Sequence, residues 1–424
     1  MPISLLWRPR SAVLIGVAIT ASVTMSLPGL ARAEPAPPYR DLLRNAGAAP
    51  RLAEAAAETR RAEGLARQAG ARPNPTLSLS SENFSGSGPY RGFDAAETTL
   101  QADLPLELGG QRAARVVAGR AEIEAARARA KQAQATYAYD LAIAYATAEA
   151  AGLRVQRAQD EVDAATEDTR AARALVEAGR EANLRALQSE ASLGAARAEL
   201  DAAKATRVAA FARLTSLAGF PRPITTISSS LLEARTAPSN AEASFDPLNS
   251  PLYLAAAAER EAAVRLIRVE QTRAIPDVTA SVGIRRFGGG NGTAALAGLS
   301  LPFPVFDRNR GNIEAARAAL QAAEARLEGS RLDAEAEGRA ALSQVAASQA
   351  RLDAALASER AASEAYRLSR IGYESGKTSL LELITARRAV GEARSAIIDA
   401  RVARTSAEAA LARLQGRIPF GETL

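Results

Sequence analysis

The sequence predicts a mainly α-helical chain, in which two long coiled-coil hairpins form part of an α-barrel and four strands contribute to a membrane β-barrel. The helices are predicted by two intervals without proline, between Pro105 and Pro221 and between Pro304 and Pro419. Both intervals are rich in strong helix formers, and proline inside a helix costs about 3 kcal/mol. Local motifs that recur at a spacing of 197 residues predict that one structural unit occurs twice.

The N-terminal segment, residues 1–33, has the features of a secretory signal peptide. Two arginines precede an apolar run over residues 12–27, and the segment ends in Ala31-Arg32-Ala33, a small-x-small cleavage pattern. The apolar run is shorter than the roughly 20 residues that a membrane-spanning helix needs. We therefore expect export and cleavage, with a mature chain that begins at Glu34.

The composition excludes several kinds of site. The chain contains no Cys and no His, so disulfides, a lipid-bearing Cys, the usual zinc sites and imidazole catalysis are all excluded. The net charge of +6 falls to +3 when the three arginines of the first 33 residues are removed. Arg and Glu alternate along the helices rather than forming a basic block, so we expect no nucleic-acid partner. The sequence predicts no enzyme, no cofactor and no resident metal.

The first structural repeat is predicted over residues 34–218. It comprises a helix over about residues 39–71, two strands that start at Thr76 and Thr98, and a helical hairpin whose first arm runs from Gln111 to Ala178. A glycine, a polar stretch and a new apolar run form a helix stop and restart at Leu175 to Leu187.

The second repeat is predicted over residues 251–415 with the same order of elements. Gly376 follows Gly179 by 197 residues, and Leu301-Pro302 follows Leu104-Pro105 by the same spacing. The connector over residues 219–250 is rich in Pro, Ser and Thr, which predicts little regular structure. The short tail, residues 416–424, gives no prediction.

The side chains at the contacts between the coiled-coil helices are predicted to be mostly small. Ile313, Leu320 and Leu327 recur every seven residues, and alanine fills most of the other inward positions. Such helices pack closely side by side in a sheet or tube. We expect Tyr137, Tyr139 and Tyr145 to be packing residues on a long helix rather than a ligand platform.

The strands are predicted to form two β-hairpins, and no other strands are expected. Turn-forming residues link them, "SGSGPYRGFD" in the first pair and "GGGNG" in the second. An isolated hairpin is marginally stable, and four strands cannot close a barrel. Their lengths approach the roughly 9–11 residues of a transmembrane strand, and three chains would supply an even number of 12 strands. We therefore predict a homotrimer with a shared barrel, in which each Leu-Pro motif marks the point where a strand leaves the membrane.

Aromatic residues at the strand ends predict an aromatic belt at the membrane surface. They are Phe84, Tyr90, Phe93, Phe287, Phe303 and Phe306.

This arrangement resembles the TolC-like family of outer-membrane efflux channels over essentially the whole mature chain. The segments "NPTLSLSSENFSGSG" (Asn74 to Gly88) and "ETTLQADLPLELGGQRAARV" (Glu97 to Val116) are most similar to the heavy-metal branch, of the cobalt-zinc-cadmium type. The resemblance implies a trimer in the outer membrane with a helical tube across the periplasm. It also implies docking onto a periplasmic adaptor protein and an inner-membrane pump of the resistance-nodulation-division type.

The resemblance further implies roles for the turns of the helical hairpins, which form the periplasmic tip in this family. The positions that match adaptor contacts are Gly179, Leu184, Gly376, Leu380 and Leu381.

A closed aperture is expected just beyond the second tip. Glu382 matches one of the family's acidic aperture positions, whereas Thr385 and Arg185 replace other acids. A ring of Glu382 side chains would attract cations, but a glutamate near a helix start is also an ordinary helix-terminus residue. The pair Arg387 and Arg388, or helix packing alone, are alternative ways to hold the closed state.

Other functions remain open at this point. A channel for drugs or for protein secretion would use the same duct. A periplasmic adaptor should instead have one helical hairpin flanked by β-rich domains, and a coiled-coil scaffold would leave the repeated strands without a purpose. We therefore expect a passive duct that exports substrates, with heavy-metal cations as the expected cargo.

Overall fold

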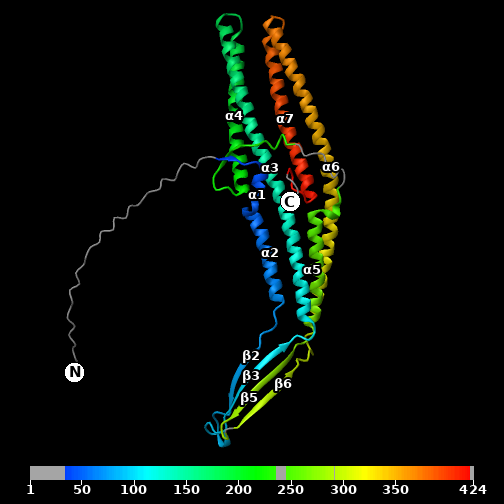
Figure 1. Cartoon of the computed structure of the whole chain (residues 1–424). Helices are drawn as coiled ribbons and strands as arrows, with labels where there is room; N and C mark the ends of the chain where they lie inside the picture. The colour runs from blue at the N-terminus through cyan, green and yellow to red at the C-terminus, as the bar shows by residue number, and fades with distance from the viewer. Residues whose placement is uncertain (1–33, 235–244, 291, 421–424) are drawn as a thin grey trace, which may run out of the picture.

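The computed structural model describes residues 34–234, 245–290 and 292–420. The predicted signal peptide lies outside the described residues. The molecule is a slender rod with the tips of two helical hairpins at one end and a curved sheet at the other (Figure 1).

Four helices make up the two hairpins. They are α3 (Gln111–Glu177), α4 (Asn183–Ala218), α6 (Arg310–Glu374) and α7 (Leu380–Leu414). At 1.5 Å per residue, the 67 residues of α3 span about 100 Å. Gly179 and Gly376 follow α3 and α6 with φ of +70° and +72°, a conformation that glycine adopts at little cost. The predicted hairpins and their turning points are confirmed.

The helix predicted over residues 39–71 is broken in the structure. It consists of α1 (Tyr39–Arg44), a 3₁₀ turn (Asn45–Ala48) and α2 (Pro50–Ala69). Proline disfavours helical geometry in the residue before it, and Ala49 is extended, with ψ of 131°. The prediction of one continuous helix was therefore wrong, whereas α5 (Pro251–Arg273) is continuous as expected and is capped by Ser250.

The four predicted strands form one antiparallel sheet at the end of the rod. They are β2 (Thr76–Glu82), β3 (Glu97–Leu106), β5 (Val278–Phe287) and β6 (Thr293–Ser300). The order is β2-β3-β5-β6, so the β3–β5 pairing joins the two halves of the chain, and β2 and β6 are the edges. Pro105 remains paired with Thr279 inside β3, whereas β6 ends before Leu301. The Leu-Pro motif therefore lies within the last three residues of β3 in the first half and directly after β6 in the second, and it marks the strand end in both.

A second, two-stranded sheet was not predicted. β1 (Glu34–Ala36) pairs in parallel with β4 (Ile224–Ile227), which lies in the connector between the halves. The expectation of no other strands was therefore wrong. Apart from β4 and a 3₁₀ turn (Pro247–Asn249), the described residues of the connector have little regular structure, as expected. β4 has the β-branched composition of a strand, Ile-Thr-Thr-Ile, but a run of four residues carries little periodicity.

The connector is held by buried polar contacts from both hairpins. The Glu149 carboxylate on α3 accepts hydrogen bonds from the backbone N–H groups of Leu231 (2.8 Å) and Leu232 (3.2 Å). From α7, Arg404 donates to the Leu232 carbonyl at 3.0 Å. Because these groups are paired, burying the two charges does not leave either without a partner.

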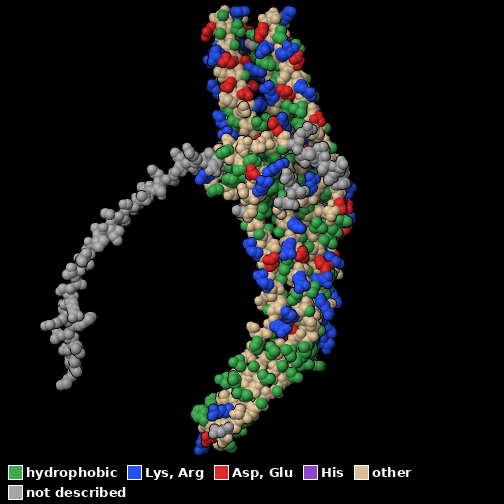
Figure 2. Space-filling model, in the orientation of Figure 1, with side chains coloured by type: hydrophobic (Ala, Val, Ile, Leu, Met, Phe, Trp, Pro, Cys, Tyr) green, Lys and Arg blue, Asp and Glu red, His purple; other side chains and the backbone are tan. Residues whose placement is uncertain are grey.

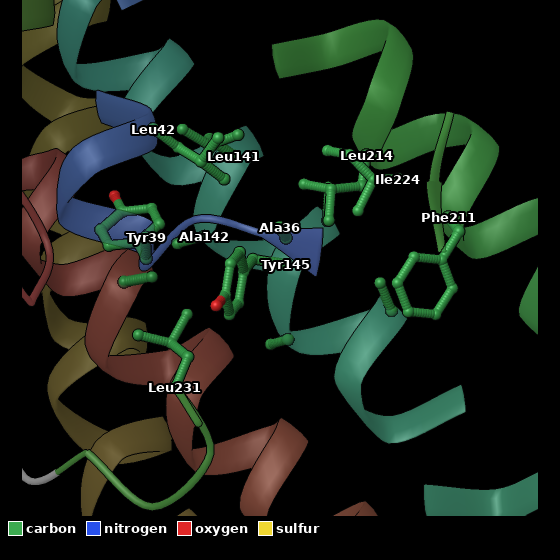
Figure 3. Close-up of a cluster of buried hydrophobic side chains, with 14 of the residues drawn as sticks. Ala36, Tyr39, Leu42, Leu141, Ala142, Tyr145, Phe211, Leu214, Ile224 and Leu231 are labelled. Carbon is green, nitrogen blue, oxygen red and sulfur yellow. The ribbon is translucent and has the colours of Figure 1, made fainter. Parts of the chain in front are cut away.

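The main hydrophobic core lies at the middle of the rod, where α1 packs against α3 (Figure 1), and Figure 3 shows its side chains. Tyr39, Leu141, Tyr145 and Leu214 are almost completely buried there, beside Ile224 of β4. The Tyr145 hydroxyl donates to the Ser229 carbonyl at 2.7 Å, and burial raises the pKa of Tyr145 to about 12, so the hydroxyl stays protonated as a donor. The predicted packing role is confirmed for this residue.

The two neighbouring tyrosines also pack within the molecule. Tyr137 is buried and donates to the Leu217 carbonyl at 3.1 Å. The guanidinium of Arg413 lies 5.5 Å from the centre of the Tyr139 ring. All three tyrosines are therefore packing residues, as predicted.

Candidate functional site

The outward face of the sheet is apolar and exposed. The strand register places Leu79, Leu100, Ile284 and Ala295 in one row across all four strands. Leu79 is 72% exposed and Ile284 is 55% exposed. Side chains of this kind cover the lower part of the molecule, whereas the helical part carries many charges (Figure 2). An exposed apolar surface of this extent marks contact with a membrane or a partner.

The opposite face of the same sheet is polar. Arg285 donates to Glu97 at 2.8 Å and to Thr99 at 3.0 Å, and Thr99 is only 6% exposed. On the same face, Gln101 donates to Asp103 at 2.7 Å. A sheet with an apolar outer face, a polar inner face and two open edges has the pattern of a sector of a water-filled membrane barrel.

Exposed aromatic side chains flank the apolar face at both of its ends. Phe84, Tyr90 and Phe93 precede β3 near the far loops, and Phe303 and Phe306 follow β6 next to the helices. Phe303 is 84% exposed and Phe306 is 99% exposed. Their positions match the two aromatic girdles of a membrane barrel.

Polar contacts fix the junction between the sheet and the helices. Arg115 on α3 binds the carboxylate of Glu107, which follows β3, and this hydrogen bonding lowers the pKa of Glu107. Gln111 donates to the Ile275 carbonyl at 2.9 Å and to Asp277 at 3.0 Å. The start of α3 is thereby attached to the end of α5 and to the residues before β5. These contacts fix the position of the start of α3 relative to β3 and β5.

None of the helices in the described part of the chain is long and apolar enough to cross a membrane.

The predicted tip residues lie at the far end of the hairpins. Gly179 and Gly376 form the turns, Leu184 is 64% exposed and Leu381 is 54% exposed. Leu380 is the first residue of α7. Exposed leucines at a polar helix end are available for a partner.

The predicted aperture residues do not lie together. Glu382 belongs to a capping box. Its carboxylate accepts a hydrogen bond from the Ser379 backbone N–H at 3.0 Å, and the Ser379 hydroxyl accepts one from the Glu382 backbone N–H at 3.3 Å. Arg387 instead points to α3, where it binds both carboxylate oxygens of Asp168 at 2.6 and 3.1 Å. Arg388 donates to Ser192 of α4 at 3.1 Å. The two arginines therefore connect α7 to both helices of the first hairpin.

A cleft of about 630 Å³ separates the two hairpins at this level. Its lining includes the Asp168 and Arg387 pair, small residues such as Ala172 and Ala195, and Leu381 near the tip. Asp168 and Arg387 keep only 22% and 21% of their side-chain surface exposed. A half-buried pair with two parallel hydrogen bonds is stronger and more specific than an exposed one.

Asp168 is a residue that the sequence analysis missed. A signal for it was present, because Asp168 lies 11 residues before Gly179 and Arg387 lies 11 residues after Gly376. One helix approaches its tip and the other leaves it, so equal spacing places both side chains at about the same depth, roughly 16 Å from the turns.

Among residues 34–234, 245–290 and 292–420, no three Asp or Glu side chains are arranged to hold a metal ion.

Comparison with known proteins identifies the family. The family model described as outer membrane efflux protein matches residues 44–220 and 248–417. The chain belongs to this family. The predicted resemblance, the fold class of a helical barrel with a β part and the outer-membrane location are thereby confirmed.

Relatives and solved structures agree with this assignment. The nickel-cobalt-cadmium resistance protein NccC of Alcaligenes xylosoxydans xylosoxydans is 44% identical, over 98% of this chain and 93% of the relative. The cobalt-zinc-cadmium resistance protein CzcC of Cupriavidus metallidurans is 30% identical, over 81% of each chain. The outer membrane protein VceC of Vibrio cholerae has the same fold, with a TM-score of 0.71 at 23% identity, over 90% of this chain and 96% of VceC.

Proposed function

We propose that three copies of this chain form a passive exit duct for heavy-metal cations, in the outer membrane, as part of a tripartite efflux system. The observation that carries the proposal is the two-faced sheet with open edges, attached directly to two long helical hairpins. The sheet has too few strands to close on itself, and its inner face is polar enough to line a path for water.

Closure of the barrel requires the unpaired edges to meet. The β2 edge of one copy would pair with the β6 edge of the next, and three copies would give 12 strands, as predicted from the sequence. The hairpins would continue the barrel as a helical tube. In this arrangement, each structural repeat (residues 34–218 and 251–415) contributes two strands and two long helices, and residues 219–250 tie the repeats together.

The proposed cargo rests on the relatives. NccC and CzcC are named for resistance to nickel, cobalt, cadmium and zinc. The chain lacks His and Cys, whose side chains bind such cations tightly. This composition suits a duct through which a cation passes without being retained. The duct supplies no chemistry of its own, and the energy for export would come from the pump.

The tips are the proposed adaptor site. We assign Gly179, Leu184, Gly376, Leu380 and Leu381 to contact with a periplasmic adaptor protein, which would link the duct to an inner-membrane pump of the resistance-nodulation-division type. The exposure of Leu184 and Leu381 supports this assignment.

The proposed closing element is the ion pair between Asp168 and Arg387, with Arg388 as a second link. The pair connects α7 to α3 inside one copy, so breaking it would free the second hairpin to move outward. Glu382 caps α7 through its carboxylate. A Glu382 ring in the trimer stays a prediction, which a conductance measurement at varied Ca²⁺ concentration on Glu382→Gln would test.

Two measurements test the proposed function. The first is the particle mass of the protein extracted from outer membranes in mild detergent, for which we expect a trimer. Recovery as a soluble monomer would overturn the shared barrel.

The second measurement is growth of a deletion strain on nickel, cobalt, cadmium or zinc, with and without the gene on a plasmid. We expect complementation to restore metal tolerance and to leave tolerance to dyes and antibiotics unchanged. Restoration of drug tolerance alone would assign the duct to a drug pump.

A further inference from the structure

A row of polar side chains crosses the apolar outer face of the sheet. The strand register aligns Ser81 with Thr98, Thr98 with Arg286, and Arg286 with Thr293, so every strand contributes one member. All four residues are exposed. The hydroxyls of Ser81 and Thr98 are 3.3 Å apart and hydrogen-bonded to each other. We call these four residues the hydroxyl-arginine row.

The row lies immediately beyond the apolar rows, on the side of the loops. The next row toward the helices contains Leu79, Leu100 and Ile284. Leu106 and Val278 begin the apolar surface three rows nearer to the helices. At about 6.8 Å for every two residues, the apolar rows cover roughly 20 Å along the strands, or about 15 Å of height at the strand tilt of roughly 40° in outer-membrane barrels. The hydroxyl-arginine row therefore lies at the loop-side edge of these apolar rows.

Arg286 differs sharply from its neighbour Arg285. Arg285 points to the inner face and is paired with Glu97 at 2.8 Å. Arg286 points outward, and no carboxylate or other acceptor among the described residues binds its guanidinium. An arginine on the lipid face is costly in hydrocarbon and tolerated only near the interface. An anionic group from outside the protein would remove that cost.

We propose that the hydroxyl-arginine row binds the headgroup phosphate of a phosphorylated lipid in the outer leaflet. Arg286 supplies a planar pair of donors that matches a phosphate, and the hydroxyl of Thr293 lies beside it on the adjacent strand. The acyl chains of the same lipid would lie on Leu100, Val282 and Ile284. A single amphiphile thereby satisfies the charge and covers the apolar rows, which free phosphate cannot do.

This inference deepens the outer-membrane placement of the sheet and rests on the proposed barrel. Arg286 lies on an inner strand of the sheet, between β3 and β6 of the same chain. The site is therefore formed within one copy, and a trimer would carry three such sites on its circumference.

The test uses the full-length protein purified as a trimer in non-ionic detergent. Native mass spectrometry counts the lipids retained after incubation with lipid A that carries both phosphates, or with the same lipid A after phosphatase treatment. We expect retention of the phosphorylated form and about fivefold weaker retention by Arg286→Gln, the effect of one arginine near a charged membrane surface. Arg286→Lys should retain an intermediate amount.

The matched control is Arg285→Gln, which removes a neighbouring charge from the inner face. Its lipid retention should equal that of the unmodified protein. Equal retention of the two lipid A forms would overturn the proposal, as would unchanged retention by Arg286→Gln. Displacement of the lipid by millimolar inorganic phosphate would show a free-anion site instead of a lipid site.

The lipid-retention measurement does not depend on the transport activity of the protein. The comparison of the two lipid forms on the unmodified protein decides the proposal even if a variant fails to assemble. The same spectra report the oligomeric state. Loss of lipid specificity with an intact trimer would therefore leave the exit-duct proposal standing, whereas a monomer would overturn the barrel itself.

Discussion

The first long helices of the two hairpins have similar lengths and sequences but different neighbours. Helices α3 and α6 have 67 and 65 residues and similar alanine-rich sequences. Yet α3 packs against α2, α4, α5 and α7, whereas α6 packs mainly against α5 and α7. Ala150 on α3 is completely buried, while Ala347, at the equivalent position 197 residues later, is exposed. Helix propensity therefore fixes the length of each arm, and the neighbours decide how much of it is buried.

The exposed side of α6 has a consequence for assembly. A helix with many exposed alanines has a smooth surface that another helix can approach closely. In the proposed trimer, we expect this side of α6 to lie against the first hairpin of the next copy. The difference in burial between α3 and α6 within one chain would then disappear when three chains associate.

The largest expected effect comes from placing a larger side chain on the buried face of α3. Ala150→Leu inserts a larger side chain into a closely packed seam and should lower the free energy of unfolding by about 2 kcal/mol. Ala347→Leu should change the stability of the isolated chain by less than about 0.5 kcal/mol. Thermal unfolding of the monomeric chain in detergent, followed by circular dichroism, measures both. Equal destabilisation by the two substitutions would contradict the comparison. Loss of the trimer in Ala347→Leu, with the helices intact, would locate that residue between copies.

A smaller effect is expected from the contact between the arms. In a double-mutant cycle with Asp168→Asn and Arg387→Gln, we expect a coupling free energy of about 1 kcal/mol, because the pair is half-buried and doubly hydrogen-bonded. Each single variant should also raise single-channel conductance in planar bilayers. The control is the exposed pair of Glu167 and Arg170 within α3, 2.7 Å apart, whose coupling should be close to zero. Equal coupling in the two cycles, or unchanged conductance, would argue against the proposed closing element.

The smallest effect concerns the restart of each hairpin. Helix α7 begins with the capping box of Ser379 and Glu382, whereas α4 begins after Ala182 without a side-chain cap. Ser379→Ala should cost about 0.5 kcal/mol locally, which is seen as faster amide hydrogen exchange in the first turn of α7. The reciprocal change, Ala182→Ser, should slow exchange in the first turn of α4. If exchange is already equal at the two restarts in the unmodified protein, the cap does not distinguish them.

Much of this architecture is predictable because the sequence patterns that specify it are long or repeated. Proline-free intervals, alternating strands and the repeated glycines at Gly179 and Gly376 all extend over many residues or occur twice. The same is true of the polar and apolar faces of the sheet, which follow from alternation along each strand. The positions of the tip residues follow directly from the glycines.

The features that could not be predicted depend on contacts between distant parts of the chain. Asp168 is one of many acidic residues on α3, and its distance from Gly179 becomes a signal only once Arg387 is known to be its partner. Glu149 likewise gains its function from the backbone of residues 231 and 232. The break before Pro50 is a different case. It could have been predicted from the sequence, because proline disfavours helical geometry in the residue before it. Alternation places Arg285 and Arg286 on opposite faces, but the register of the sheet is needed to bring Glu97 within reach of Arg285 and to place Thr98 and Thr293 beside Arg286.

The parallel pairing of β1 with β4 has a consequence for the order in which the protein can be made. Glu34, the predicted first residue of the mature chain, is aligned with Ile224, so the N-terminus cannot find its partner until about half of the chain has been exported. Closing such a long loop carries an entropic cost before any contact is gained. During that interval the apolar strands of the first half, including Leu77 and Leu79, would be exposed to water. Neither the β1–β4 pair nor the β3–β5 pairing of the large sheet can therefore form before the second half of the chain has been exported.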